Sequence, residues 1–139
     1  MSQFHFLFRE DKGQIGRGLW WRATLGLSAV WLVIFSSYLF LGQGDITKVG
    51  LTAILTIATI MLGVCYYFVS AKRFQDLGQN AGLALILPLA FLFDAAIHWM
   101  QPQLGATFPS LLTYAFDAAT VLITGWTVWT LGGRKGHLP

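Results

Sequence analysis

The sequence predicts an all-α membrane protein, an antiparallel bundle of four transmembrane helices with both termini in the cytoplasm. Of its 139 residues, 55% are hydrophobic and only 11% are charged, whereas a typical soluble domain carries about 25% charged residues. A single core of this size cannot bury so much apolar surface, so the excess is expected to face lipid or other membrane proteins. The apolar residues form continuous runs without strand-like alternation, which argues against a membrane β-barrel.

Four nearly uncharged runs have the length of about 20 residues that a helix needs to cross a hydrocarbon core about 30 Å thick. They span residues 19–41, 49–70, 83–100 and 108–131. Only Arg22 interrupts the first run, one turn from its start, where a long side chain can reach the interface. The short connections predict that consecutive helices are antiparallel neighbours. The first run is too long for the apolar part of a cleavable signal peptide.

The distribution of basic residues predicts the orientation. Eight of the nine Lys and Arg residues lie near the start of the first run, between the second and third runs, or after the fourth, while the other side holds Lys48 alone. Basic residues favour the cytoplasmic side, so residues 1–18 and 132–139 are expected in the cytoplasm. The first of these segments mixes Phe4 and Phe6 with charges, and we expect it to lie along the cytoplasmic leaflet.

Two of the runs carry a stripe of small and hydroxyl-bearing residues at alternating intervals of four and three. The stripes are Thr52, Thr56, Thr59, Gly63, Tyr66 and Ser70 on the second run, and Ser110, Thr113, Asp117, Thr120, Thr124 and Thr127 on the fourth. Such stripes let membrane helices approach closely and hydrogen-bond to one another. We therefore expect them to face the bundle interior, and a polar pathway for a solute is the alternative interpretation.

A candidate intramembrane polar site combines Asp94, His98 and Asp117 with Thr113 and Thr120. Asp94 lies 94 − 83 = 11 residues into the third run and Asp117 lies 117 − 108 = 9 residues into the fourth, so the two acids have nearly the same depth in an antiparallel pair. His98 follows Asp94 by four residues and shares its helix face. Ionisable groups at this depth usually mark functional sites. A hydrogen-bonded acid that only fixes helix packing is the alternative.

The segment between the second and third runs is predicted to be a tight turn. Arg73 and Asp76 are three residues apart and pair if the helix continues. Gly78 suits a C-terminal helix cap and Asn80 suits an N-cap. We expect Lys72 and Arg73 to tether this turn to anionic lipid headgroups. The alternative is a docking surface for a partner protein, formed by Arg17, Lys72, Arg73, Asp76 and Gly78.

Two segments resemble motifs of the domain-of-unknown-function 805 family, small bacterial inner-membrane proteins of the YhaH type. The matching residues are Gly13, Arg17, Trp20 and Trp21 at the start of the first run, and Arg73, Asp76, Gly78 and Gly82 in the turn. Gln14 and Gln75 replace an Arg and a His of the family motifs, so the chain resembles a divergent member. The resemblance implies a bacterial inner-membrane location and a four-helix layout. It implies no activity, because the family has no established biochemical function.

No sequence motif indicates a reaction, a metal or a cofactor, since the sequence has no phosphate-binding loop, dinucleotide fingerprint, metal-ligand cluster or nucleophile–base spacing. With one cysteine, Cys65, it forms no intrachain disulfide. We expect a non-enzymatic accessory or stabilising subunit of a larger membrane complex. Its expected partners are anionic lipids, other integral membrane proteins or further copies of itself, and not nucleic acid. A small transporter or proton- or cation-coupled component that uses Asp94 and Asp117 is the alternative.

The topology yields the first testable prediction. Reporter tags fused at residue 1 and at residue 139 should both be found in the cytoplasm, and a tag in the 101–107 loop should be found on the far side, because basic residues are retained on the cytoplasmic side. Protease protection in sealed membrane vesicles measures this directly. Access to either terminus from the far side would contradict the predicted orientation.

Overall fold

The computed structural model describes residues 7–8, 13–41, 45–104 and 110–136, and these residues are almost entirely helical, with no strand among them. The elements are α2 (Arg17–Leu41), α3 (Asp45–Asp76), the 3₁₀ turn η1 (Ala81–Leu85), α4 (Ile86–Leu104), α5 (Ser110–Thr127) and the π-helical turn η3 (Val128–Gly133). Within the described ranges, four helical segments are long and apolar enough to cross a membrane. The predicted all-α class is therefore confirmed for the described residues, as are four helices that are long and apolar enough to span a membrane.

Helix α3 extends beyond the predicted apolar run, and the polar residues in this extension form hydrogen bonds and an ion pair. α3 ends at Asp76, which is 76 − 70 = 6 residues after the predicted end of the second run. The predicted third helix begins as the turn η1 and becomes α-helical at Ile86. The predicted fourth helix is divided into α5 and the π-helical η3, and its first two predicted residues lie outside the described ranges.

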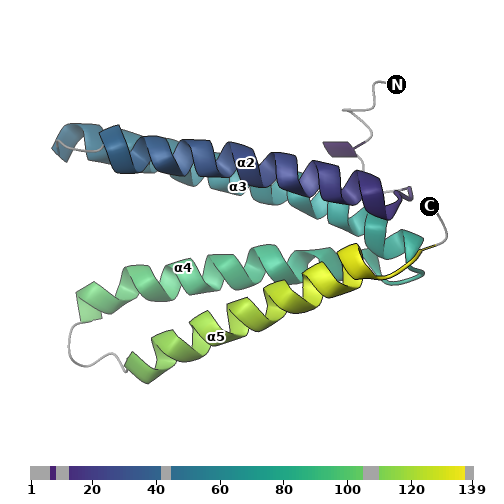
Figure 1. Ribbon diagram of the computed structural model, residues 1–139. Helices are drawn as coiled ribbons and strands as arrows, with labels where there is room; N and C mark the ends of the chain where they lie inside the picture. Colours follow the sequence, from purple (N-terminus) through teal and green to yellow (C-terminus); the bar gives the residue numbers. More distant parts are fainter. Residues whose placement is uncertain (1–6, 9–12, 42–44, 105–109, 137–139) are drawn as a thin grey trace.

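The four helices form two antiparallel hairpins, α2 with α3 and α4 with α5. The hairpins meet at one end and diverge toward the other (Figure 1). Contacts between them run mainly through η1 and η3, while α3 and α4 touch little. As a result Thr52, Thr56 and Thr59 are exposed, and the structure does not place this part of the α3 stripe in a closed interior.

We call the end where the hairpins meet the junction. It comprises the start of α2, the end of α3, η1 and η3. Its buried apolar side chains form the core of the described residues: Ile15, Trp20, Val69, Ala71, Phe74, Ala84 and Leu131. Along the rest of the helices large apolar residues are exposed, for example Val33, Ile57 and Phe93. This division fits a membrane protein, in which lipid covers the apolar surface that a soluble protein would bury.

The turn between α3 and η1 has the two predicted caps. Gly78 adopts a left-handed conformation with φ of 70°, and the amide of Gln79 donates to the carbonyl of Phe74 at 2.8 Å, which closes the end of α3. Asn80 precedes η1, and its side-chain oxygen accepts from the amide of Gly82 at 2.8 Å. The chain therefore reverses from α3 to α4 within a few residues.

Replacing Gly78 by valine should destabilise the protein. A β-branched side chain is strained at positive φ, and the left-handed conformation costs about 1–2 kcal/mol for a residue with a Cβ atom. The matched control is Gly63→Ala, because Gly63 lies within α3 and a Cβ atom added there would have no neighbouring atom within 4 Å. Thermal unfolding in detergent should show a lower midpoint for Gly78→Val only; equal midpoints for the two variants would contradict the cap.

Candidate functional site

Asp94, His98 and Asp117 lie together in the α4–α5 hairpin. Asp94 and His98 are one turn apart on α4, and Asp117 is on α5. The ring nitrogen Nε2 of His98 lies 2.8 Å from Oδ1 of Asp117. One potential ligand atom from each of the three residues lies within 4.8 Å of the other two. The structure thus brings together the three ionisable residues of the predicted intramembrane site.

Asp94 and Asp117 lie inside the two candidate membrane spans of the hairpin, residues 81–98 and 111–133, and His98 is the last residue of the first of these spans. Asp117 is 117 − 110 = 7 residues after the start of α5, which is about 10 Å along the helix axis. The side chains of His98 and Asp117 are 50% and 42% exposed, and Asp94 is half-buried. The Asp94 carboxyl faces that of Asp117, and its Oδ1 atom is shielded from solvent and has no hydrogen-bond partner among the described residues. One acid of the cluster therefore keeps an acceptor atom unused.

The acids of the cluster need a proton or a bound cation to balance their charge. α4 and α5 contain no Lys or Arg, so His98 is the only residue of these two helices that can carry positive charge beside the two acids. Two ionised carboxylates and one imidazolium still leave an excess of one negative charge. In a low-dielectric environment such an excess is costly, and buried charges are normally paired or bound to metal.

Thr113 and Thr120, the other two predicted site residues, are buried on the same face of α5 as Asp117, with 4% and 7% of their surface exposed. The Thr113 hydroxyl has no hydrogen-bond partner. The hydroxyl of Thr124 donates to the carbonyl of Thr120 within the same helix, at 2.8 Å. Thr127 likewise donates to its own helix. The sequence predicted hydrogen bonds between helices, but these two hydroxyls bond within α5, because each reaches the carbonyl one turn earlier.

One interhelical bond of the predicted kind is present in the other hairpin. Nε1 of Trp31 on α2 donates to the hydroxyl of Thr59 on α3 at 3.1 Å. The Trp31 ring also stacks on Phe35, with ring centroids 5.0 Å apart. The α3 stripe therefore contributes one contact within the α2–α3 hairpin.

The turn residues that were candidates for docking a partner are mostly buried at the junction. Arg73 and Asp76 form the predicted ion pair, and both side chains are fully buried. Nε of Arg73 donates to the carbonyl of Leu131 at 2.9 Å, and Nη2 donates to the carbonyl of Arg134 at 2.6 Å. The guanidinium therefore connects the end of α3 to the C-terminal end of the fourth helix.

Lys72 is also fully buried. Its Nζ donates to the carbonyl of Leu7 at 3.2 Å and to that of Phe68 at 3.5 Å. The expectation that Lys72 and Arg73 tether the turn to lipid headgroups is wrong for this structure, because both cations bind protein acceptors instead. Asp76 is buried too, so only Arg17 and Gly78 of the five residues predicted to form a docking surface are exposed. This burial favours a structural role for the turn.

Several junction contacts were not predicted from the sequence. Trp20 donates from Nε1 to the hydroxyl of Ser70 at 3.2 Å, and the amide of Gly13 donates to Oε1 of Gln75 at 3.0 Å. Leu7 and Phe8 are half-buried, and Ile15 is buried against the junction core. The described part of the N-terminal segment thus packs on protein, while the rest of the predicted interfacial stretch lies outside the described residues.

Two glycines of the C-terminal segment permit its close approach. A Cβ atom at Gly132 would lie 2.6 Å from the ring of Trp21, whose Nε1 donates to the Gly132 carbonyl at 3.3 Å. A Cβ atom at Gly136 would overlap the carboxylate of Asp76 and lie 2.6 Å from Nη1 of Arg73. The glycines after the fourth run were the only sequence signal for these contacts.

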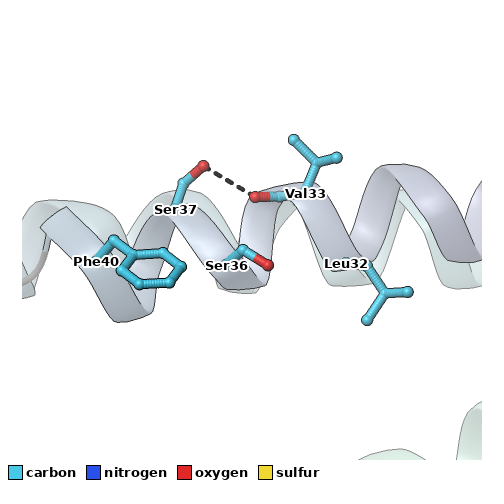
Figure 2. A pocket seen from close by; sticks show the side chains of 5 residues that line it. All are labelled: Leu32, Val33, Ser36, Ser37 and Phe40. Carbon is cyan, nitrogen blue, oxygen red and sulfur yellow. Dashed lines mark hydrogen bonds between the residues drawn. The ribbon is translucent and has the colours of Figure 1, made fainter.

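A shallow depression on α2 carries no comparable chemistry (Figure 2). It is lined by Leu32, Val33, Ser36, Ser37 and Phe40. All five residues come from one helix, and the Ser37 hydroxyl donates to the carbonyl of Val33 at 2.8 Å. The depression is therefore part of an open helix surface, without a second element to enclose a ligand.

Comparison with protein-family models, curated proteins and solved structures found no match to this chain. The resemblance to the domain-of-unknown-function 805 family stays a prediction. The function is therefore inferred from the geometry of the chain.

Replacing Arg73 by lysine should destabilise the junction although it retains the charge. A lysine ammonium cannot reproduce the forked contacts to Asp76 and two carbonyls, and buried acceptors left unpaired cost about 1–3 kcal/mol each. The control is Arg22→Lys, because Arg22 is exposed and bonds only within its own helix. We expect a lower free energy of unfolding in denaturant titrations for Arg73→Lys and no change for Arg22→Lys. Two indistinguishable titrations would rule out the contacts described for Arg73.

Proposed function

We propose that this chain is a multi-pass protein of the bacterial inner membrane, with both termini cytoplasmic, that acts as a small transporter or cation-coupled component. The observation that carries the proposal is the cluster of Asp94, His98 and Asp117 within 4.8 Å inside a membrane-spanning hairpin. The proposal selects the alternative function considered from the sequence, because the acids and the histidine converge on one point.

Packing alone is a weak explanation for this cluster. A single Asp at the centre of a membrane helix costs about 2.5–3.5 kcal/mol on insertion scales. The α4–α5 contact already has uncharged packing residues, since Thr113, Thr120 and Thr127 are buried along α5. Placing two acids and a histidine in this helix contact raises the free-energy cost of inserting the helices into a membrane, and packing alone does not require them. A role in binding a cation accounts for their presence.

The partial exposure of the cluster supports exchange of a ligand. Half of the His98 side chain and 42% of that of Asp117 are not covered by the rest of the chain, so a water-filled cavity formed with a neighbouring molecule would give an ion access to the acids. Four helices leave little room for a closed pathway. We therefore include self-association in the proposal, with further copies of the chain completing the pathway around the cluster.

The accessory-subunit function remains a second candidate, and one observation favours it. The hydroxyl-bearing stripe of α3 is exposed at Thr52, Thr56 and Thr59, although such stripes typically contact other helices in membranes. Trp31 already donates to the hydroxyl of Thr59, so a partner helix would contact this face mainly at Thr52 and Thr56. Purification in mild detergent with mass spectrometry distinguishes the candidates, because a stoichiometric partner of different sequence supports the accessory function and its absence argues against it.

Cation uptake tests the proposed transport function. Proteoliposomes containing the purified chain should take up at least one cation when Na⁺, K⁺, Mn²⁺ and Zn²⁺ gradients are imposed in turn. Asp117→Asn should reduce this uptake by at least about tenfold, because it removes a charged ligand of the site. The control Ser37→Ala should retain wild-type uptake, since Ser37 bonds only within α2. Uptake of none of these ions, or uptake unaffected by Asp117→Asn, would contradict the proposal.

A further inference from the structure

We infer that Asp94, His98 and Asp117 form a binding site for a divalent first-row transition-metal ion. The inference rests on the proposed function and deepens it by naming the class of cation. Its basis is a mixed donor set, one imidazole nitrogen and two carboxylate oxygens, whose atoms lie within 4.8 Å of one another on two packed helices.

The donor set and its charge select the ion. Imidazole favours Zn²⁺, Fe²⁺ and related metals, and carboxylates also suit Mn²⁺, whereas Ca²⁺ and Mg²⁺ prefer sites made of oxygen alone. No thiolate takes part, because the single cysteine, Cys65, is on α3. A divalent ion balances the two carboxylates beside a neutral His98. A coordinating His98 must be neutral, so a monovalent ion beside two ionised carboxylates would leave one negative charge, which is costly in a low-dielectric environment unless a carboxyl keeps a proton.

The local geometry suits coordination. Asp94 and His98 have the i, i+4 spacing that places two ligands on one helix face. Metal–ligand bonds of about 2.0–2.2 Å in a tetrahedral site separate two ligand atoms by roughly 3.4 Å. Nε2 of His98 and Oδ1 of Asp117 are 2.8 Å apart, so a small side-chain rotation admits the ion. Both side chains are half-exposed and have room for it.

Two of the five buried side-chain atoms without a hydrogen-bond partner among the described residues belong to the cluster or its helix face, and they are compatible with a bound ion. Oδ1 of Asp94 has no partner and no access to solvent, and a bound ion supplies the missing interaction. The Thr113 hydroxyl is also without a partner although the residue is only 4% exposed. Thr113 precedes Asp117 by four residues on the same face of α5, where a hydroxyl can orient a coordinating carboxylate.

Equilibrium binding of metal alone tests the inference. The full chain, purified in detergent with its affinity tag removed and then treated with a chelator, is dialysed against Zn²⁺ or Mn²⁺ and its metal content is measured by mass spectrometry. We expect one equivalent per chain. Asp94→Asn, His98→Gln and Asp117→Asn should each weaken binding by at least about tenfold. The control replaces the remaining histidines, His5→Ala and His137→Ala, and should bind as the wild type does.

Absence of stoichiometric binding would overturn the inference. So would binding that survives all three site variants and is lost in the His5→Ala, His137→Ala control. If a site variant does not fold, X-ray absorption at the zinc edge of the wild-type protein decides the question: one imidazole with only nitrogen and oxygen ligands supports the site, and a sulfur ligand or no imidazole overturns it.

The metal site and the transport function can fail separately. Uptake of Na⁺ or K⁺ that depends on Asp117, without binding of Zn²⁺ or Mn²⁺, would overturn the metal site and leave the proposed function. Stoichiometric binding of Zn²⁺ at the three residues, without uptake of any cation, would support the metal site and overturn transport.

Discussion

The buried guanidinium of Arg73 is the interaction on which the arrangement of the two hairpins depends. It pairs with Asp76 on its own helix and donates to the carbonyls of Leu131 and Arg134. The last carbonyls of a helix have no hydrogen-bond donor within that helix. At the end of the π-helical η3, the Arg73 guanidinium is the donor to these carbonyls. An unpaired charge at this position would be strongly destabilising. The ion pair and the chain end therefore depend on each other, and together they join α3 to the C-terminal segment.

The candidate site depends on a different set of contacts from the junction. The α4–α5 hairpin is packed along a threonine stripe, Thr113, Thr120 and Thr127, and this packing brings Asp117 to His98. The two hairpins diverge away from the junction (Figure 1), and the side chains of His98 and Asp117 are 50% and 42% exposed. The protein thus combines a buried, hydrogen-bonded end with helical arms whose exposed surfaces are largely apolar. In a membrane this division separates the parts that maintain the fold from the proposed cation site.

Much of the fold was predictable because its signals are local. Run length and composition predicted the helices, and Gly78 and Asn80 predicted the caps of the turn. Counting residues from the helix ends predicted that Asp94 and Asp117 share a depth. The burial of Lys72 and Arg73 was not predictable, because their acceptors are backbone carbonyls separated from them by 65 and 58 residues along the chain. Every residue has a backbone carbonyl, so the sequence does not indicate which carbonyl will accept a hydrogen bond from a given Lys or Arg side chain.

Distance measurement between the hairpins tests most directly whether Arg73 holds them in one arrangement. Spin labels at position 39 of α2 and position 111 of α5 report the separation of the two arms, since Leu39 and Leu111 are 56% and 77% exposed; Cys65 is first replaced by alanine. In lipid nanodiscs the account predicts one narrow distance distribution with Arg73 present and a broad one after Arg73→Lys. A distribution of the same position and width in both proteins would contradict it.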